Sequence, residues 1–125
     1  MRIFKSKGVV RFARQEKITD TSLQDAISRA ERGLIDADLG GGVIKQRVAR
    51  PGQGRSGGYR MIVAYRVKNR AVFLFGFAKN ERTNISSDEL QTLQTIGAKW
   101  LAASPKVINQ AIEDGVLQEV LVDEE

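Results

Sequence analysis

The spacing of apolar residues predicts two helices in the first third of the chain. After a short strand at residues 2–4, residues 8–16 place their apolar side chains on one side of a helix. A second helix is capped by Thr19, Asp20 or Thr21 and ends at Gly33. Its buried stripe repeats at intervals of three and four residues and consists of Leu23, Ala26, Ile27 and Ala30.

From residue 43 onward the apolar period changes to two, which predicts strands. Residues 34–42 end in consecutive glycines and are predicted to be a turn into the sheet. Residues 51–58 are rich in proline and glycine and are predicted to be an exposed mobile loop. Residues 68–70 are a tight hairpin turn, in which Asn69 accepts a left-handed conformation. The predicted strands form an antiparallel meander of residues 43–49, 59–67 and 71–78.

Two further helices are predicted after these strands. The first begins at Ser86 or Ser87, where a hydroxyl and a nearby carboxylate satisfy main-chain N–H groups. Gly97 falls on its apolar face and permits a close approach by another element. Residues 106–113 form the second helix, closed by Gly115. The apolar face of the first helix consists of Leu90, Leu93, Ile96, Trp100 and Leu101.

The order of elements defines an α+β fold, with N-terminal helices, a meander sheet of three to four strands and C-terminal helices. Residues 116–125 are expected to add an edge strand before a frayed acidic tail. With 125 residues, 42% of them hydrophobic, the chain suits one domain over residues 1–125. No apolar run approaches the ~20 residues that span a bilayer, and the N-terminus does not resemble a signal peptide. We therefore expect a cytoplasmic protein.

Composition excludes several kinds of chemistry. The chain has no cysteine and no histidine. Disulfides, thiolate nucleophiles, imidazole triads and the usual zinc ligands are therefore impossible. No cofactor or metal is expected.

Charge is distributed unevenly along the chain. Residues 45–82 hold ten cations and one acid, a net charge of +9, whereas residues 83–125 hold two cations and eight acids, a net charge of −6. Such a concentrated positive charge repels itself, and a polyanion relieves the repulsion. Single-stranded RNA is the favoured ligand, although each of these cations taken alone is as well explained by a solvated surface charge.

The predicted strands bring several cations together. Lys45 and Arg47 share one face of a strand, Arg60 begins the next strand, and Lys79 and Arg82 follow the third. All of the residues proposed to contact RNA come from the predicted strands or from the loops that join them. Arg50 and Arg55 extend the patch into the loop, and Tyr59, Tyr65 and Phe77 offer rings for base stacking or for the core.

The glycine-rich residues 51–58 do not form a nucleotide loop, because they join two strands rather than a strand and a helix. Metal-dependent hydrolysis is disfavoured, since Glu81 is the one acid in this region. Metal-free RNA cleavage by the substrate's own 2′-hydroxyl is compatible with these residues. Lys45 is the candidate base and Lys79 the candidate acid. The residues that stabilise phosphate charge are then Arg47, Arg60 and Arg82.

The motifs KQR at residues 45–47, GGYR at 57–60, AVFLFGF at 71–77 and KNER at 79–82 resemble the RelE/HigB-type toxins of bacterial toxin–antitoxin pairs. The resemblance covers about residues 9–101. It implies a RelE-like, microbial-ribonuclease-like fold and metal-free cleavage of messenger RNA in the ribosome. Carried over by position, it assigns catalytic roles to Lys45, Arg47, Arg60, Lys79 and Arg82. The sequence departs from the family at Asn80, which replaces a catalytic arginine and is retained as an RNA-binding position, and at Ser86, which replaces a tyrosine.

The resemblance also implies partners, namely the ribosome with its messenger RNA and a cognate antitoxin of the helix-turn-helix type. Two other functions stay open. One is a ParE-like toxin that inhibits gyrase without cutting RNA, and the other is an RNA-binding module without catalysis. The departures at Asn80 and Ser86 keep both alternatives in place, with Tyr59 or Tyr65 as substitute bases if the chain does cleave RNA.

Overall fold

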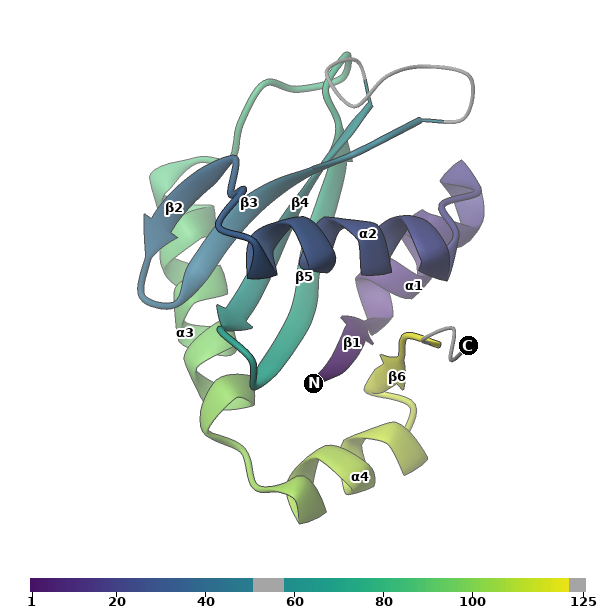
Figure 1. The fold of residues 1–125 in the computed structure, drawn as a ribbon, viewed down its shortest axis with the longest axis vertical. Coiled ribbons are helices and arrows are strands. Elements are labelled where there is room, and N and C mark those ends of the chain that lie inside the picture. The colour runs from purple at the N-terminus through teal and green to yellow at the C-terminus, as the bar shows by residue number, and fades with distance from the viewer. Residues whose placement is uncertain (51–57, 122–125) are drawn as a thin grey trace.

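In the computed structural model, residues 1–50 and 58–121 form a mixed sheet with helices on both faces (Figure 1). The strands have the order β2-β3-β4-β5-β1-β6. Their bounds are β1 Arg2–Ser6, β2 Ala37–Gly40, β3 Val43–Val48, β4 Tyr59–Arg66, β5 Arg70–Ala78 and β6 Leu117–Glu119. The helices are α1 Lys7–Glu16, α2 Asp20–Glu31, α3 Ser87–Ala102 and α4 Pro105–Glu113. The α+β fold expected from the sequence is confirmed.

Each helix begins at a hydroxyl that accepts a hydrogen bond from the first turn. Thr19 caps α2, and Ser104 caps α4 ahead of Pro105. Ser86 forms a capping box with Glu89, in which the hydroxyl accepts from the Glu89 N–H while the carboxylate accepts from the Ser86 N–H. These bonds fix the start of each helix, because the first N–H groups of a helix have no partner within it.

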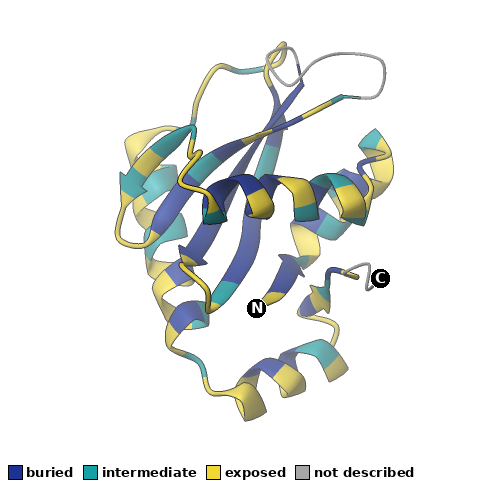
Figure 2. Ribbon diagram, viewed as in Figure 1, coloured by how far each residue is buried: buried dark blue, intermediate teal, exposed yellow. Residues whose placement is uncertain are grey.

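The buried strands carry a separate core on each face (Figure 2). On one face, Leu23 and Ile27 of α2 and Val9 of α1 pack over Met61 and Phe73 of the sheet. On the other face, α3 covers two clusters. These include Val43, Ile62 and Phe77 in one cluster and Ala64, Val72, Leu74 and Leu101 in the other. The sheet is therefore apolar on both faces. A charged residue buried within it is costly unless it is paired or hydrogen-bonded.

The sheet has six strands in the described ranges, rather than the three to four that were expected. The predicted meander corresponds to β3, β4 and β5, which pair antiparallel. β1 pairs parallel to β5, and β6 pairs with β1 at the edge. The strand expected within residues 116–125 is thus present, while residues 51–57 and 122–125 lie outside the described residues. The parallel pairing joins segments far apart in sequence, so local periodicity could not predict it.

Three local predictions were wrong. β2 lies within the predicted turn, because Gly41 and Gly42 take positive φ values of 63° and 80° and form a hairpin with β3. In the turn after β4, Lys68 rather than Asn69 has the positive φ, 55°. Ile96 is 40% exposed and lies off the packed face of α3.

Gly97 supplies the close approach that was predicted for it. A Cβ at this position would lie 3.1 Å from the Ala64 Cβ. The absence of that Cβ lets α3 rest directly on β4.

Candidate nucleic-acid interface

Two predicted cations lie directly opposite each other in the sheet. Arg47 of β3 and Arg60 of β4 are Cα partners, and Phe77 of β5 is the partner of Arg60 on its other side. Because alternate residues share a face, Arg47 lies on the same face as Val43, and Arg60 lies on the same face as Ile62. The row Arg47, Arg60, Phe77 therefore crosses three strands on the face that α3 covers.

Arg60 is buried, with 6% of its surface exposed, whereas the Arg47 side chain is 48% exposed. Burial and the neighbouring Arg47 lower the pKa of Arg60, while Asp36 opposes that shift. Asp36 accepts from the Nε of Arg47 at 2.8 Å. Like charges directly opposite each other destabilise a strand pair. Asp36 offsets part of this repulsion, and a bound anion would offset more of it.

Arg82 completes the row from the loop after β5. Its guanidinium lies 5.5 Å from the ring centroid of Phe77 and 5.8 Å from that of Phe75. The same guanidinium donates to both carboxylate oxygens of Glu89, at 2.6 and 3.1 Å. This pairing lowers the pKa of Glu89 to about 2. Arg82 is therefore positioned over the aromatic rings by the start of α3.

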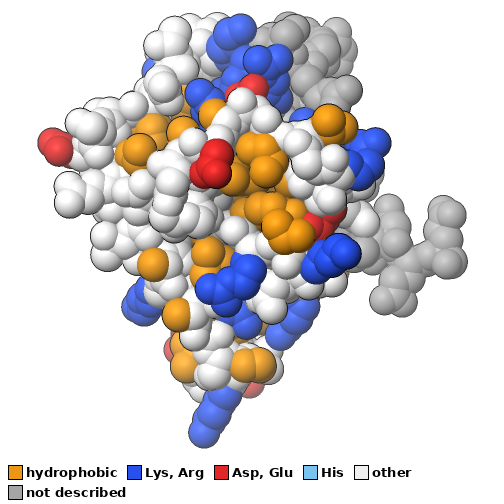
Figure 3. All heavy atoms as spheres, turned by 60° about the vertical axis from the view of Figure 1, so that its left-hand side comes forward, with side chains coloured by type: hydrophobic (Ala, Val, Ile, Leu, Met, Phe, Trp, Pro, Cys, Tyr) orange, Lys and Arg blue, Asp and Glu red, His pale blue; other side chains and the backbone are white. Residues whose placement is uncertain are grey.

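The remaining predicted cations lie around this row. Lys45 is half-buried on the same face as Arg47, two residues earlier in β3. Lys79 is exposed just past β5, and its N–H donates to the Gly58 carbonyl at the base of β4. Asn80 is exposed in the following turn. Figure 3 shows lysine and arginine side chains gathered at one end of the side that carries β2 and α3, above an area of hydrophobic side chains.

The structure separates the two tyrosines from this row. Tyr59 is 1% exposed on the opposite face, where its ring contacts Phe12 edge-on and its hydroxyl donates to Glu16 at 3.2 Å. Tyr65 donates to the Glu31 carboxylate on that same face. Burial, together with these hydrogen bonds, raises the pKa of both tyrosines. A raised pKa makes a tyrosine a weaker candidate for a general base.

Arg50, which was predicted to bind RNA, and Ser86, where the sequence departs from the family, both lie outside the row. The guanidinium of Arg50 lies 5.8 Å from the Tyr59 ring centroid, so Arg50 contacts the opposite face of the sheet. Ser86, which stands where the family has a tyrosine, is the cap of α3. Arg55 lies outside the described residues.

Sequence reasoning missed Asp36 and Glu89 as partners of the arginines. Both acids lie more than five residues from the cation that they contact. Their contribution depends on the β2–β3 hairpin and on the capping of α3. The Ser86–Glu89 capping pattern was visible in the sequence, but nothing in it indicated that Arg82 would share the same carboxylate.

Taken together, the fold and the row of cations define a small α+β protein with a candidate site for a phosphate-bearing ligand. Residues 1–120 match the family model described as the RelE toxin of the RelE/RelB toxin–antitoxin system. The chain therefore belongs to the RelE toxin family, and this membership implies a toxin with a cognate antitoxin. No curated protein matches the sequence. None of the helices within the described ranges is long and apolar enough to cross a membrane.

Proposed function

We propose that this toxin is a ribosome-dependent endoribonuclease that acts on messenger RNA in the cytoplasm. The observation that carries the proposal is the direct pairing of Arg47 with Arg60 on one face of the sheet. Two arginines on neighbouring strands can each donate to a non-bridging oxygen of a phosphate. Phe77 continues the row with an aromatic side chain, over which Arg82 lies.

The proposed reaction is attack by the substrate's 2′-hydroxyl on the adjacent phosphorus, with loss of the 5′-oxygen. Arg47 and Arg60 stabilise the additional negative charge of the phosphorane. Lys45, on the same face as Arg47, accepts the proton of the 2′-hydroxyl. Lys79, just past the end of β5, protonates the leaving oxygen. Arg82, which pairs with Glu89, contacts a flanking phosphate.

Asp36 has a positioning role in this proposal. Its carboxylate holds the Nε of Arg47 at 2.8 Å, and its own N–H donates to the Gln46 side chain. Gln46 is fully buried and bonds to the Ala26 carbonyl of α2. The conformation of Arg47 is thereby linked to the opposite face of the sheet. An arginine held in this way loses less rotamer freedom when it binds a phosphate.

The test is to induce the wild-type chain, Arg47→Ala and Arg60→Lys separately in a bacterium, and then to map messenger RNA ends and DNA breaks. Arg60→Lys keeps the charge of the buried position, which separates chemistry from folding. The exposed Arg32→Ala is the matched control. We expect growth arrest with new RNA ends for the wild type and the control, and loss of both for Arg47→Ala.

Other outcomes identify the alternatives. DNA breaks without new RNA ends indicate a gyrase-directed toxin. Binding of RNA without either kind of break indicates a binding module. Circular dichroism of each purified variant checks that the fold is retained.

A further inference from the structure

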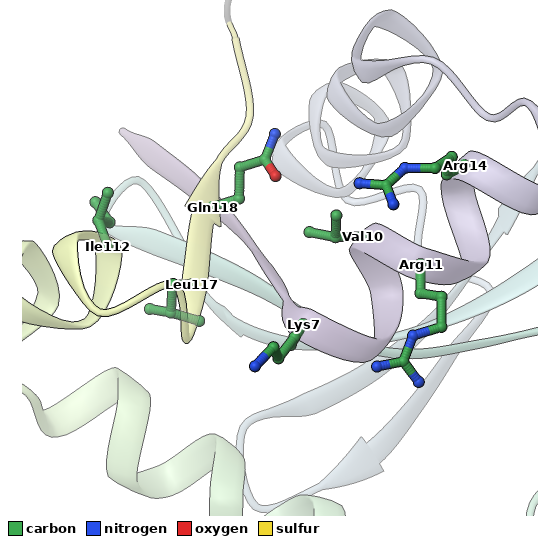
Figure 4. A pocket seen from close by; sticks show the side chains of 8 residues that line it. Lys7, Val10, Arg11, Arg14, Ile112, Leu117 and Gln118 are labelled. Carbon is green, nitrogen blue, oxygen red and sulfur yellow. The ribbon is translucent and has the colours of Figure 1, made fainter.

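A second cationic surface lies on the outer side of α1, away from the Arg47–Arg60 row. A groove of about 410 Å³ separates α1 from β6 and the end of α4 (Figure 4). Lys7, Arg11 and Arg14 line its α1 side. Its apolar lining is formed by Val10 of α1, Ile112 of α4 and Leu117 of β6.

Arg14 lies in the last turn of α1, where a cation is favourable, but the three cations as a set have no evident role in stability. They recur at intervals of four and three residues, so they lie along one side of α1. Lys7 is in the first turn, where a helix favours acids, and α1 has no acid in that turn. Lys7 and Arg11 are also a like-charge pair four residues apart, which destabilises a helix. Within the described ranges, none of the three forms an ion pair.

The chemistry of the groove favours a peptide over a nucleic acid. Its apolar side chains provide a contact for aliphatic groups, which a phosphate backbone lacks. The α4 side is the C-terminal end of a helix, which carries partial negative charge. Glu113 and Asp114 are exposed at that end. A phosphate backbone would be repelled there, whereas a peptide can direct its carboxylates to α1 and its apolar side chains to the groove.

We propose that this groove binds a segment of the cognate antitoxin that carries both acidic side chains and aliphatic side chains such as leucine. The proposal rests on the proposed toxin function for the identity of the partner. The groove belongs to α1, β6 and α4, while the Arg47–Arg60 row lies on the opposite face of the sheet from α1. A segment bound in the groove therefore holds the antitoxin without occupying the RNA site.

The first experiment uses the purified chain and a synthetic probe. The probe is a fluorescein-labelled peptide of alternating leucine and glutamate pairs, and binding is followed by anisotropy. Reversing the charge of the groove with Lys7→Glu, Arg11→Glu and Arg14→Glu is expected to weaken binding by about tenfold or more. The matched control reverses the charge of three exposed cations elsewhere, Arg32→Glu, Lys99→Glu and Lys106→Glu. The control is expected to change the affinity by less than about twofold.

A single substitution tests the apolar contact separately. Val10→Asn leaves the charge of α1 unchanged and is expected to weaken peptide binding by about threefold or more. Equal weakening by the groove variant and the control variant would overturn the proposal, because attraction would then follow net charge alone. A single-stranded RNA oligonucleotide whose affinity falls tenfold in the groove variant alone would also overturn it, since the groove would then be an RNA site.

The second experiment uses the toxin produced together with the antitoxin of its own operon. The groove variant is expected to retain about tenfold less antitoxin on purification than the control variant. RNA cleavage by the groove variant alone is expected to equal that of the wild type. Peptide binding without any loss of antitoxin would overturn the assignment of the partner. If the chain neither cuts RNA nor arrests growth, the proposed function fails, while the peptide experiment still decides whether the groove binds acidic segments.

Discussion

β4 carries a cross-strand arginine pair at each end, and the two pairs differ in what surrounds them. At one end, Arg66 pairs with Arg70 of β5. Arg66 donates to the Leu101 carbonyl, and Arg70 donates to the carbonyls of Trp100 and Ala103, all at the C-terminal end of α3. At the other end, Arg47 and Arg60 lie beside the Asp36 carboxylate.

The partners of the two pairs differ accordingly. The end of a helix carries partial negative charge and carbonyls without partners, so Arg66 and Arg70 complete the cap of α3. Burial and neighbouring arginines lower the pKa of Arg60 and of Arg70 alike, so the distinction rests on the partners: Arg70 donates to the end of α3, whereas the Arg47 side chain is 48% exposed. Asp36 offsets part of the repulsion between Arg47 and Arg60, and a bound anion would offset more of it. We therefore propose that the Arg47–Arg60 end contacts RNA and that the Arg66–Arg70 end serves folding.

The largest expected effect is on cleavage at the Arg47–Arg60 end. Arg47→Ala is expected to lower the rate of RNA cleavage about 100-fold or more, because a donor to the phosphorane is lost. Its free energy of unfolding is expected to stay within about 0.5 kcal/mol of the wild type. The substitution removes the ion pair with Asp36, but it also removes the repulsion between Arg47 and Arg60, and the two effects largely cancel. Cleavage of purified messenger RNA on ribosomes and urea unfolding measure the two quantities. An unstable Arg47→Ala variant that still cleaves normally would reverse the assignment.

The opposite result is expected at the other end. Arg70→Ala removes two hydrogen bonds of 2.7 Å to the end of α3. The free energy of unfolding is expected to fall by about 1–3 kcal/mol, which is typical of hydrogen bonds from a charged donor. Cleavage per folded molecule is expected to be unchanged. Chemical denaturation measures the stability, and a large loss of cleavage without destabilisation would erase the distinction between the two pairs.

Packing at the structural end gives a third test. Gly97→Val places new methyl groups against Ala64, whose Cβ would lie 3.1 Å from the first added carbon. We expect a loss of about 1–3 kcal/mol in stability as α3 is pushed from β4. The adjacent Ala98→Val is the control, because Ala98 is exposed. Thermal unfolding of both variants measures the effect, and equal losses would show that β-branching rather than contact with the sheet is responsible.

The smallest effect concerns Glu89. Its pKa, about 2 against an ordinary 4.5, is depressed by the hydrogen bond from Arg82 and the bond from the Ser86 N–H. A depressed pKa stabilises the fold above pH about 4.5, and this contribution is lost as the pH falls through about 2. The stability gap between the wild type and Glu89→Gln is therefore expected to be complete at pH 7 and to close on acidification.

The same substitution releases Arg82 from its partner, so RNA affinity is expected to rise about twofold to threefold at low salt. Asp88→Asn, one residue earlier in the first turn of α3, is the control. Thermal unfolding between pH 7 and pH 2 and anisotropy with labelled RNA provide the two readings. A stability gap that stays constant across this pH range would contradict the role of the Glu89 carboxylate.

The sequence was most informative where the signal was local. Caps such as Thr19 and Ser86 and the strands of the meander could be predicted, because hydroxyl caps and a period of two are local patterns. The faces of β3 could also be predicted, and with them the proximity of Arg47 to Arg60. The family resemblance named from four motifs is confirmed by the match over residues 1–120.

Contacts between distant segments could not be predicted. The parallel pairing of β1 with β5 and the salt bridge of Asp36 with Arg47 depend on the assembled sheet. The burial of Tyr59 and Tyr65 could not be predicted either, since a tyrosine that alternates with arginines fits both a core and a stacking surface. A bulge at Leu74 changes which residues of β5 share a face, and it brings Phe75 and Phe77 to the same side as Arg82.

The most direct test of the account is the salt dependence of RNA binding. An RNA oligonucleotide with a 2′-deoxy sugar at the cleavage position binds without being cut, and its affinity is measured at several salt concentrations. Each lost contact with a phosphate of single-stranded RNA lowers the slope of log affinity against log salt by about 0.7. We predict this loss for Arg47→Gln and an unchanged slope for Arg66→Gln. Equal slopes for the two variants would contradict the assignment of RNA binding to the Arg47–Arg60 end of β4.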